Sequence, residues 1–346
     1  MADQNLSNFL ARLMRSEDLS RAETLQLLDS LLDGQATDAQ IGAILIALKR
    51  KGETVDELAG LAEGMRARAV RIKSGHRRFI DTAGTGSSAA KTFNVSTAAA
   101  FVIAGAGLPV AKHGNRAASS RCGSADVLSV LGVNVSVEAA VSETCLNEAG
   151  ICFMFAPLYH GATARVAGVR RELGVQTTFN LLGPLTNPAG APRQLVGVWG
   201  RDLVEPMART LAQLGTERSW VVHGADGLDE ITIADATFVA EARAGEVRSF
   251  EIKPEDFGLT RHGLDDLRGC DAEGNAAIIR AVLSGKRRDE ARALVVINAA
   301  SALHVGGAAN DLREGVRLAQ ESIDKGGALE KLDQLVRITN EPGARP

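Results

Sequence analysis

The chain has 346 residues, of which 45% are hydrophobic and 4% aromatic, and its formal net charge is -3 at pH 7. This length suits one large domain with a smaller one, and the hydrophobic share excludes an intrinsically disordered chain. So few aromatic residues argue against a stacking platform for single-stranded nucleic acid. A slightly acidic chain is not attracted as a whole to phosphate backbones, so any anion-binding site must be local.

The cysteine pattern and the apolar stretches predict where the protein works. Cys122, Cys145, Cys152 and Cys270 form no CxxC pair and have no regular spacing, which favours reduced thiols. The first twenty residues scatter charges through an amphipathic pattern that differs from a signal peptide. The longest apolar stretch, residues 98–110, is too short and too rich in glycine to span a bilayer. We therefore expect a soluble, cytoplasmic protein.

The first seventy residues predict helices with clear start signals. Ser20 with Glu23, and Thr54 with Glu57, have the spacing of capping boxes, and Thr37 opens a helix between them. Leucine and isoleucine recur on one side of each segment, as expected for amphipathic helices. No strand-like alternation occurs before residue 78, so this part of the chain is predicted to be all helical.

The pattern changes after the basic connector at residues 73–78. Apolar runs that begin at positions 79, 108, 195 and 220 predict strands, and helical patterns begin at 96, 204, 271, 289 and 312. Repeated strand, helix and strand units favour a parallel sheet covered on both faces. The predicted fold class is α/β, with a small helical domain at residues 1–75 and a large domain at residues 76–346 built on a mostly parallel central sheet flanked by helices. A segment around residues 165–190 is expected to pack with the small domain, which is expected to form a homodimer surface.

The first polar cluster, GTGSSAAKTFNVST, spans residues 84–97 between a predicted strand and a predicted helix. Gly84 and Gly86 let the backbone turn sharply and approach a ligand. The start of the helix adds unpaired N–H groups and a positive partial charge. These features predict an anion-binding turn, and an ordinary glycine and serine turn with a helix cap is the alternative. The polar side chains of this turn are Ser87, Ser88, Thr92, Asn94, Ser96 and Thr97.

The second polar cluster, KHGNRAASSRCGSAD, spans residues 112–126 and also follows a predicted strand. Ligands of α/β proteins bind where strands of this kind end, so the cluster predicts contacts to a second anionic group. A solvated cationic loop is the alternative. The cluster contains Lys112, His113, Asn115, Arg116, Ser119, Ser120, Arg121 and Ser124.

Asp229 and Glu230 form an adjacent acidic pair after an apolar run and a glycine-rich turn. On a loop two such carboxylates can converge, and their hard oxygen atoms suit Mg²⁺. A solvated acidic turn is the alternative. A protein with two anion-binding clusters and little net charge makes a bridging cation the more attractive interpretation.

Arg170 and Arg171 lie on a short helical pattern before the rigid turns of FNLLGPLTNP. An arginine that reaches the pocket can hold the carboxylate of an acceptor with two parallel hydrogen bonds. A surface cation is the alternative for both residues.

Taken together, these segments resemble the anthranilate phosphoribosyltransferase family along nearly the whole chain. The motifs KHGNRAASS and FNLLGPLTNPAGAP carry the resemblance, with GCDAEGNAAIIRAVLSGK at residues 269–286. The resemblance implies a fold of the nucleoside phosphorylase/phosphoribosyltransferase type. It also implies transfer of the phosphoribosyl group from phosphoribosyl pyrophosphate (PRPP) to anthranilate in tryptophan biosynthesis, with two Mg²⁺ ions per subunit bound with PRPP between the domains.

Matching positions imply the site residues. Anthranilate is assigned to Gly84, Asn115 and Arg170, and the metal to Ser96, Asp229 and Glu230. No general base is assigned, because an aromatic amine is already neutral at pH 7. PRPP is assigned to Gly84, Ser87, Ser88, Thr92, Asn94, Val95, Ser96, Thr97, Lys112, His113, Gly114, Asn115, Arg116, Ala117, Ala118, Ser119, Ser120 and Ser124.

Three positions depart from the family pattern. GTGSSA replaces the usual GTGGDG, so Ser88 stands for a carboxylate, and this change is expected to alter Mg²⁺ dependence or weaken donor binding. Cys122 stands where serine is usual, and Gln176 where arginine is usual. His113 could orient the acceptor or be structural. A paralogue with another aromatic acceptor, a nucleoside phosphorylase of the same fold and a non-catalytic sensor of PRPP stay open as alternatives.

Overall fold

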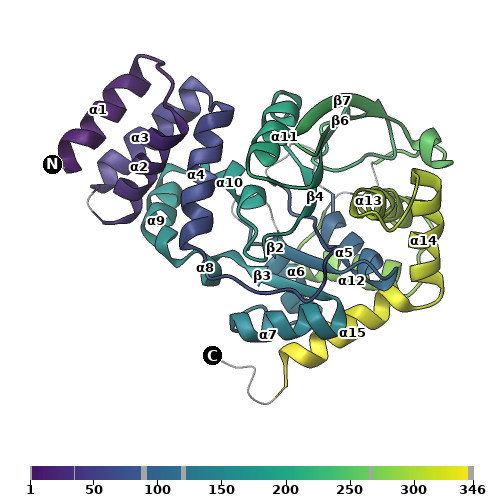
Figure 1. The fold of residues 1–346 in the computed structure, drawn as a ribbon. Coiled ribbons are helices and arrows are strands. Elements are labelled where there is room, and N and C mark those ends of the chain that lie inside the picture. The colour runs from purple at the N-terminus through teal and green to yellow at the C-terminus, as the bar shows by residue number, and fades with distance from the viewer. Residues whose placement is uncertain are drawn as a thin grey trace.

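A computed structural model describes residues 2–34, 36–86, 92–117, 122–264, 267 and 269–341. Within these ranges a group of N-terminal helices lies beside a larger α/β part (Figure 1). The N-terminal helices are α1 (Ala2–Met14), α2 (Arg21–Leu32), α3 (Asp38–Lys51) and α4 (Val55–Arg68).

Capping boxes start three of these helices. Ser20 and Thr54 accept hydrogen bonds from the main-chain N–H groups of Glu23 and Glu57, which confirms both predicted boxes. Thr37 forms a third box with Gln40. Each box satisfies backbone donors that the first turn of a helix leaves unpaired, so the local sequence fixes where the helices begin.

The described strands form one seven-stranded sheet with the order β3-β2-β1-β4-β5-β6-β7. Strands β1 to β5 are parallel, and β6 and β7 are antiparallel, which confirms the prediction of a mostly parallel sheet. The strands are β1 (Ile80–Asp81), β2 (Val110–Gly114), β3 (Ile151–Phe155), β4 (Arg193–Gly197), β5 (Arg218–Gly224), β6 (Thr237–Arg243) and β7 (Glu246–Ile252).

Two differences from the predicted strands have clear physical reasons. The strand predicted from residue 108 begins at Val110, because Pro109 has no N–H group to donate to a neighbour. Strand β3 was not predicted, and neither was the hairpin of β6 and β7. Its strands turn at Ala244 and Gly245, which both have positive φ angles of the kind that tight hairpin turns require.

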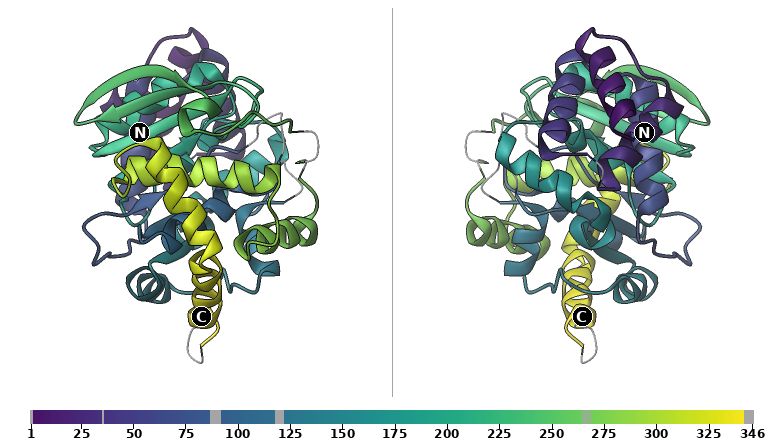
Figure 2. Two further views of the ribbon diagram at one scale, coloured as in Figure 1. Left: turned by 90° about the vertical axis from the view of Figure 1, so that its right-hand side faces the viewer. Right: turned by 90° about the vertical axis from the view of Figure 1, so that its left-hand side faces the viewer.

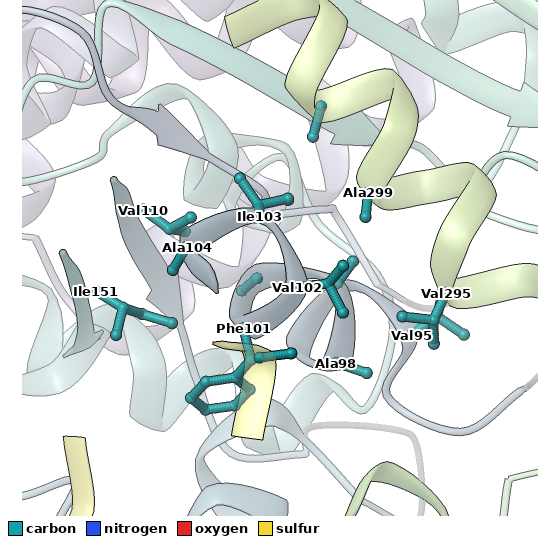
Figure 3. Close-up of a cluster of buried hydrophobic side chains, with 14 of the residues drawn as sticks. Val95, Ala98, Phe101, Val102, Ile103, Ala104, Val110, Ile151, Val295 and Ala299 are labelled. Carbon is teal, nitrogen blue, oxygen red and sulfur yellow. The ribbon is translucent and has the colours of Figure 1, made fainter. Parts of the chain in front are cut away.

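Helix α5 (Val95–Gly105) lies at the centre of the larger hydrophobic core. Nearly all of its side chains are buried, as expected for a helix that is apolar on every side. Figure 3 shows Phe101, Val102 and Ile103 of α5 in this core, with Val110 and Ile151 from neighbouring strands. Helix α13 (Glu290–Gly306) packs against α5 and contributes Val295 and Ala299, among other residues, to the same core. Packing of this kind fixes the N-terminus of α5 relative to the sheet.

Helices pack on both faces of the sheet, with α13 against β4 and β5 and α11 (Val204–Gln213) against β5 and β6. Alternate residues divide between the faces: Leu195 and Val222 enter the core around α5, whereas Val196 and Val221 enter a second core. This second core also contains side chains from α1–α4, so the N-terminal helices and one face of the sheet share it. The views in Figure 2 place α14 on the opposite side of the molecule from α1–α4. The further helices are α6 (Ser124–Val130), α7 (Ala139–Thr144), α8 (Ala156–Tyr159), α9 (Ala164–Leu173), α10 (Phe179–Leu185), α11 (Val204–Gln213), α12 (Ala272–Leu283), α14 (Leu312–Asp324) and α15 (Gly327–Thr339).

Helices α9 and α10 lie next to the N-terminal helices. In the described ranges, α9 contacts α2 and α3, and α10 contacts α4 and the sheet strand β2. Val166 and Phe179 belong to the second core together with Leu28 and Leu45. None of the described helices has both the length and the apolar character that a membrane crossing requires.

Candidate active site

A cavity of about 350 Å³ opens at the carboxyl ends of β1, β2, β4 and β5. The chain runs from β1 to β2 on one side, while β4 lies on the other side, so the cavity sits at a switch point of the sheet. Ser87, Ser88, Ala118, Ser119, Ser120 and Arg121 lie outside the described residues. All the other residues assigned to a substrate or the metal line this one cavity, whereas Arg171 does not and is exposed. The lining residues among them are Gly84, Thr92, Asn94, Val95, Ser96, Thr97, Lys112, His113, Gly114, Asn115, Arg116, Ala117, Ser124, Arg170, Asp229 and Glu230.

Glycines bring three main-chain segments together at the base of the cavity. The N–H group of Thr85 donates to the carbonyl oxygen of Gly197 at 2.9 Å. A Cβ atom on Gly84 would lie 3.0 Å from that same oxygen. A Cβ atom on Gly197 would overlap the main-chain carbonyl oxygen of Asp229. The segment after β1, the end of β4 and the acidic pair are therefore in close contact, and at Gly197 only a residue without a side chain permits it.

Lys112 and Ser96 connect the two predicted anion-binding clusters. The Lys112 Nζ atom donates to the carbonyl oxygen of Thr82 at 3.0 Å and to the Ser96 hydroxyl at 3.3 Å. Ser96 in turn donates its main-chain N–H to Glu230 Oε1 at 3.2 Å. Glu230 thereby occupies the N-terminus of α5, where a negative charge is favoured.

The charges in this group perturb one another. Burial, and then the adjacent charge of Asp229, raise the pKa of Glu230 above its ordinary value. Burial lowers the pKa of Lys112, and the charges of Asp81 and Glu230 oppose that change. Ionisable groups with shifted pKa values in a cavity at the edge of a sheet are typical of a functional site.

The oxygen atoms around Ser96 suit a magnesium ion. Within the described ranges, no three His, Cys, Asp or Glu side chains gather closely enough to hold a metal ion by themselves. Asp229 and Glu230 with the Ser96 hydroxyl offer instead a small set of hard oxygen donors. Mg²⁺ is commonly held by one or two carboxylates while substrate phosphates and water complete its coordination. A cation here would also offset the repulsion that raises the pKa of Glu230.

His113 is neutral at physiological pH. Its Nδ1 atom lies 3.1 Å from the carbonyl oxygen of Gly183, so we assign the ring proton to Nδ1. Burial, and then the nearby His160, lower the pKa of His113 to about 3. Its Nε2 atom is buried and has no hydrogen-bond partner among the described residues. His113 therefore contributes no positive charge to anion binding.

Arg170 enters the cavity from α9 on the side of the N-terminal helices. One of its terminal nitrogen atoms donates to Asn180 Oδ1 at 3.1 Å, and its guanidinium lies 5.7 Å from the centre of the Phe179 ring. Asn180 Oδ1 also accepts from the N–H group of Thr177 at 3.0 Å. The Arg170 Nε atom is buried without a partner among the described residues, and burial lowers the pKa of this guanidinium. An anionic group that binds beside Arg170 would satisfy that donor.

Several residues of the cavity were not predicted. Phe179, Asn180 and Gly183 come from the FNLLGPL segment, which predicted turns and carried the family resemblance but was assigned no site residue. Gly197 and Asn298 lie in a strand and a helix without any local motif. Cys122, one of the departures from the family pattern, lines the cavity, and its thiol lies 3.3 Å from Asn94 Oδ1.

The buried carboxyl group of Asp81 gives a test of how burial near this cavity affects stability. Its Oδ1 atom accepts from the N–H groups of Ala83 and His113, and burial raises the pKa of Asp81 to about 6. The ordinary value is about 3.9, so the folded state loses stability as the pH rises from 4 through 6. We expect the free energy of unfolding of Asp81→Asn, relative to that of the wild type, to increase by on the order of 3 kcal/mol as the pH rises over this range. Urea denaturation at pH 4 and pH 7 measures the change, and an unchanged difference between the proteins would contradict it.

Comparison with known proteins agrees with this geometry. The a/b domain of the glycosyl transferase family matches residues 76–329, and the helical bundle domain of that family matches residues 7–69. The anthranilate phosphoribosyltransferase of Moorella thermoacetica is 52% identical over 327 residues, which cover 94% of this chain and 96% of that protein.

Two solved structures share the fold over almost the whole chain. The crystal structure of anthranilate phosphoribosyltransferase from Thermus thermophilus has a TM-score of 0.90 and 38% identity, and the match covers 95% of this chain and 98% of that chain. The enzyme from Saccharomyces cerevisiae in complex with PRPP and Mg has a TM-score of 0.88 and 27% identity, with coverage of 97% and 98%. The chain therefore belongs to the anthranilate phosphoribosyltransferase family.

Proposed function

We propose that this protein transfers the phosphoribosyl group of PRPP to anthranilate, giving N-(5-phosphoribosyl)anthranilate and pyrophosphate in tryptophan biosynthesis. One observation carries the proposal: the described parts of both anion-binding clusters, the acidic pair and Arg170 line a single cavity. A cavity of this kind can hold a sugar diphosphate and an aromatic acid side by side.

The donor side of the cavity is built to hold charge. Ser96, Asp229 and Glu230 would hold magnesium, and we expect two ions per subunit when PRPP is bound. Bound Mg²⁺ would neutralise the charge that develops on the leaving pyrophosphate. The N-terminus of α5 and the buried Lys112 add positive potential from the protein itself. The residues that the family resemblance implies for PRPP are proposed as its binding site.

Displacement of pyrophosphate by the aromatic amine requires alignment more than proton transfer. The reaction develops positive charge on the ribose ring, and the amine attacks without prior deprotonation. Residues that fix the acceptor behind the anomeric carbon therefore lower the barrier by reducing the entropy cost of alignment. We assign this task to Gly84, Asn115 and Arg170, which line the cavity.

Arg170→Ala should raise the KM for anthranilate at least tenfold and change the KM for PRPP less than about threefold. The reason is that removal of a charged partner of a carboxylate costs roughly 1.5–3 kcal/mol. Arg170 is assigned to the acceptor and not to PRPP, so the loss should fall on anthranilate binding. Steady-state kinetics with each substrate varied in turn measures both constants. Arg171→Ala is the matched control, because Arg171 is the next residue of α9 and is exposed. Equal damage to both KM values would remove Arg170 from the acceptor site.

A direct assay separates the proposed reaction from its alternatives. Anthranilate with PRPP and Mg²⁺ should lose its fluorescence as the product forms. A paralogue would leave anthranilate unchanged and consume PRPP with another aromatic amine. A nucleoside phosphorylase would release free base from a nucleoside and inorganic phosphate, and a sensor would bind PRPP without turnover. Any of these three results would overturn the assignment.

We further propose that the protein is a cytoplasmic homodimer that associates through the helical domain at residues 1–75. The segment around residues 165–190 would complete that domain. A shallow groove between α3 and α9 supports this proposal, since Ile46 is 39% exposed there beside the apolar Val169 and Leu173. Light scattering after size-exclusion chromatography measures the mass in solution. A monomer at micromolar concentration would contradict the dimer.

A further inference from the structure

Asn298 is a buried amide that pairs with a single residue of the loop after β5. It lies on α13, and only 1% of its surface is exposed. Its Oδ1 atom accepts from the N–H group of Ile231 at 2.9 Å, and its Nδ2 atom donates to the carbonyl oxygen of Ile231 at 2.8 Å. The second Nδ2 hydrogen is used by the carbonyl oxygen of Leu294 at 2.9 Å. The amide thus satisfies both main-chain groups of Ile231 in a buried place, where unpaired groups are costly.

Ile231 is the residue directly after Glu230, so its main chain determines where the acidic pair lies. The side chains of Ile231 and Ile233 are buried in the larger core, which anchors the loop on the side away from the cavity. The N–H group of Thr232 donates to Thr237 Oγ1 at 3.1 Å. The carboxylates of Asp229 and Glu230 therefore extend from a main chain that is held by Asn298 next to them and by the core behind them.

Helix α13 also packs against α5, whose first turn carries Ser96. Val295 and Ala299, one turn or less from Asn298, are labelled beside α5 in Figure 3. The hydroxyl of Ser96 and the two carboxylates come from segments more than a hundred residues apart. Asn298 links them, because its helix fixes α5 by packing and fixes the acidic loop by hydrogen bonds.

We infer that Asn298 is a positioning residue for the magnesium-binding carboxylates, acting through the main chain of Ile231. The inference rests on the proposed function, since that function identifies the metal. Magnesium demands nearly ideal octahedral geometry, so a loop that shifts by a fraction of an ångström binds it less well. Loss of residues that orient metal ligands typically weakens metal affinity or activity by about 10–100-fold.

The test compares Asn298→Ala with Ser301→Ala in the full chain. Ser301 is a buried control on the same helix, and its hydroxyl bonds only to the carbonyl oxygen of Ile297 among the described residues. Asn298→Ala should raise the Mg²⁺ concentration for half-maximal activity about tenfold and leave the KM for anthranilate within about twofold. Electron paramagnetic resonance with Mn²⁺ alone should show a similar loss of metal affinity. Hydrogen exchange at the Ile231 amide, measured without substrates, should become at least about tenfold faster. Ser301→Ala should match the wild type in all four measurements.

Unchanged Mn²⁺ affinity in a folded Asn298→Ala variant would overturn the inference, as would an equal loss in affinity for anthranilate. If this variant does not fold, the same measurements on Asn298→Ser test the inference. The serine hydroxyl can bond to Leu294 on the same helix, but the side chain is too short to pair with Ile231. If the wild type does not catalyse the reaction, but Asn298→Ala still shows the expected loss of Mn²⁺ affinity and faster hydrogen exchange, the proposed reaction is refuted and the positioning role is supported. If the wild type catalyses the reaction and Asn298→Ala shows neither change, the proposed reaction is supported and the positioning role is refuted.

Discussion

Replacing Asp229 and Glu230 together with Ala should abolish transfer at every accessible Mg²⁺ concentration. The pair supplies the two carboxylates that line the described part of the cavity, and one of them accepts from the main-chain N–H of Ser96. Without the pair, the described lining offers no acidic side chain to a cation. Loss of several kcal/mol of charge stabilisation corresponds to a rate decrease of roughly a thousandfold or more. The fluorescence assay across a Mg²⁺ titration measures the effect.

A control on the same loop tests whether the effect is specific to this pair. Asp235→Ala removes a carboxylate that is exposed and pairs with Arg261, and it should retain wild-type activity. The double variant should also remain folded, because neither side chain belongs to a hydrophobic core cluster of the described residues. Retained activity in the double variant would remove both residues from the metal site.

Gly197→Ala should lower kcat/KM at least about a hundredfold. The added methyl group would overlap the carbonyl oxygen of Asp229, so the acidic loop or the end of β4 must move. Displacement of a catalytic group by about 1 Å can cost this much, even where no side chain of the site is altered. Kinetics with PRPP and anthranilate, together with PRPP affinity by calorimetry, measure the change.

Gly168→Ala is the matched control for this substitution. Gly168 lies on α9, two residues before Arg170, and a Cβ atom there meets nothing within 4 Å. Alanine also favours a helix more than glycine does, so this variant should be at least as stable as the wild type. Wild-type kcat/KM in Gly197→Ala would show that the contact between β4 and the acidic loop is not needed for the reaction.

Local signals in the sequence predicted much of this protein. The boxes at Ser20 and Thr54 begin real helices, and the strand and helix patterns from residue 79 onward predicted a mostly parallel sheet. These signals succeed because a helix cap or an apolar run depends on residues close together in the chain. The order of the strands could not be predicted. It depends on packing between segments such as β1 and β4, which lie more than a hundred residues apart.

The residues of the candidate site also divide into those that local motifs predicted and those that depend on long-range packing. Residues in the polar sequence motifs, such as Lys112, Ser96 and Glu230, were predicted, and the structure places them within hydrogen-bonding distance of one another or of a shared neighbour. Gly197 and Asn298 were not predicted, because each acts on a main-chain group distant in sequence and neither belongs to a motif. Asn180 lay within a motif, but its hydrogen bond to Arg170 depends on how α9 and α10 pack.

We propose that the two polar clusters and the acidic pair form one site for PRPP and magnesium. Isothermal titration calorimetry of PRPP with the wild type, with Mg²⁺ and then with EDTA, tests this claim most directly. We predict that PRPP binds at least about tenfold more tightly with Mg²⁺, and that the Asp229→Ala/Glu230→Ala variant loses this difference. Equal PRPP affinity with Mg²⁺ and with EDTA in the wild type would contradict the claim.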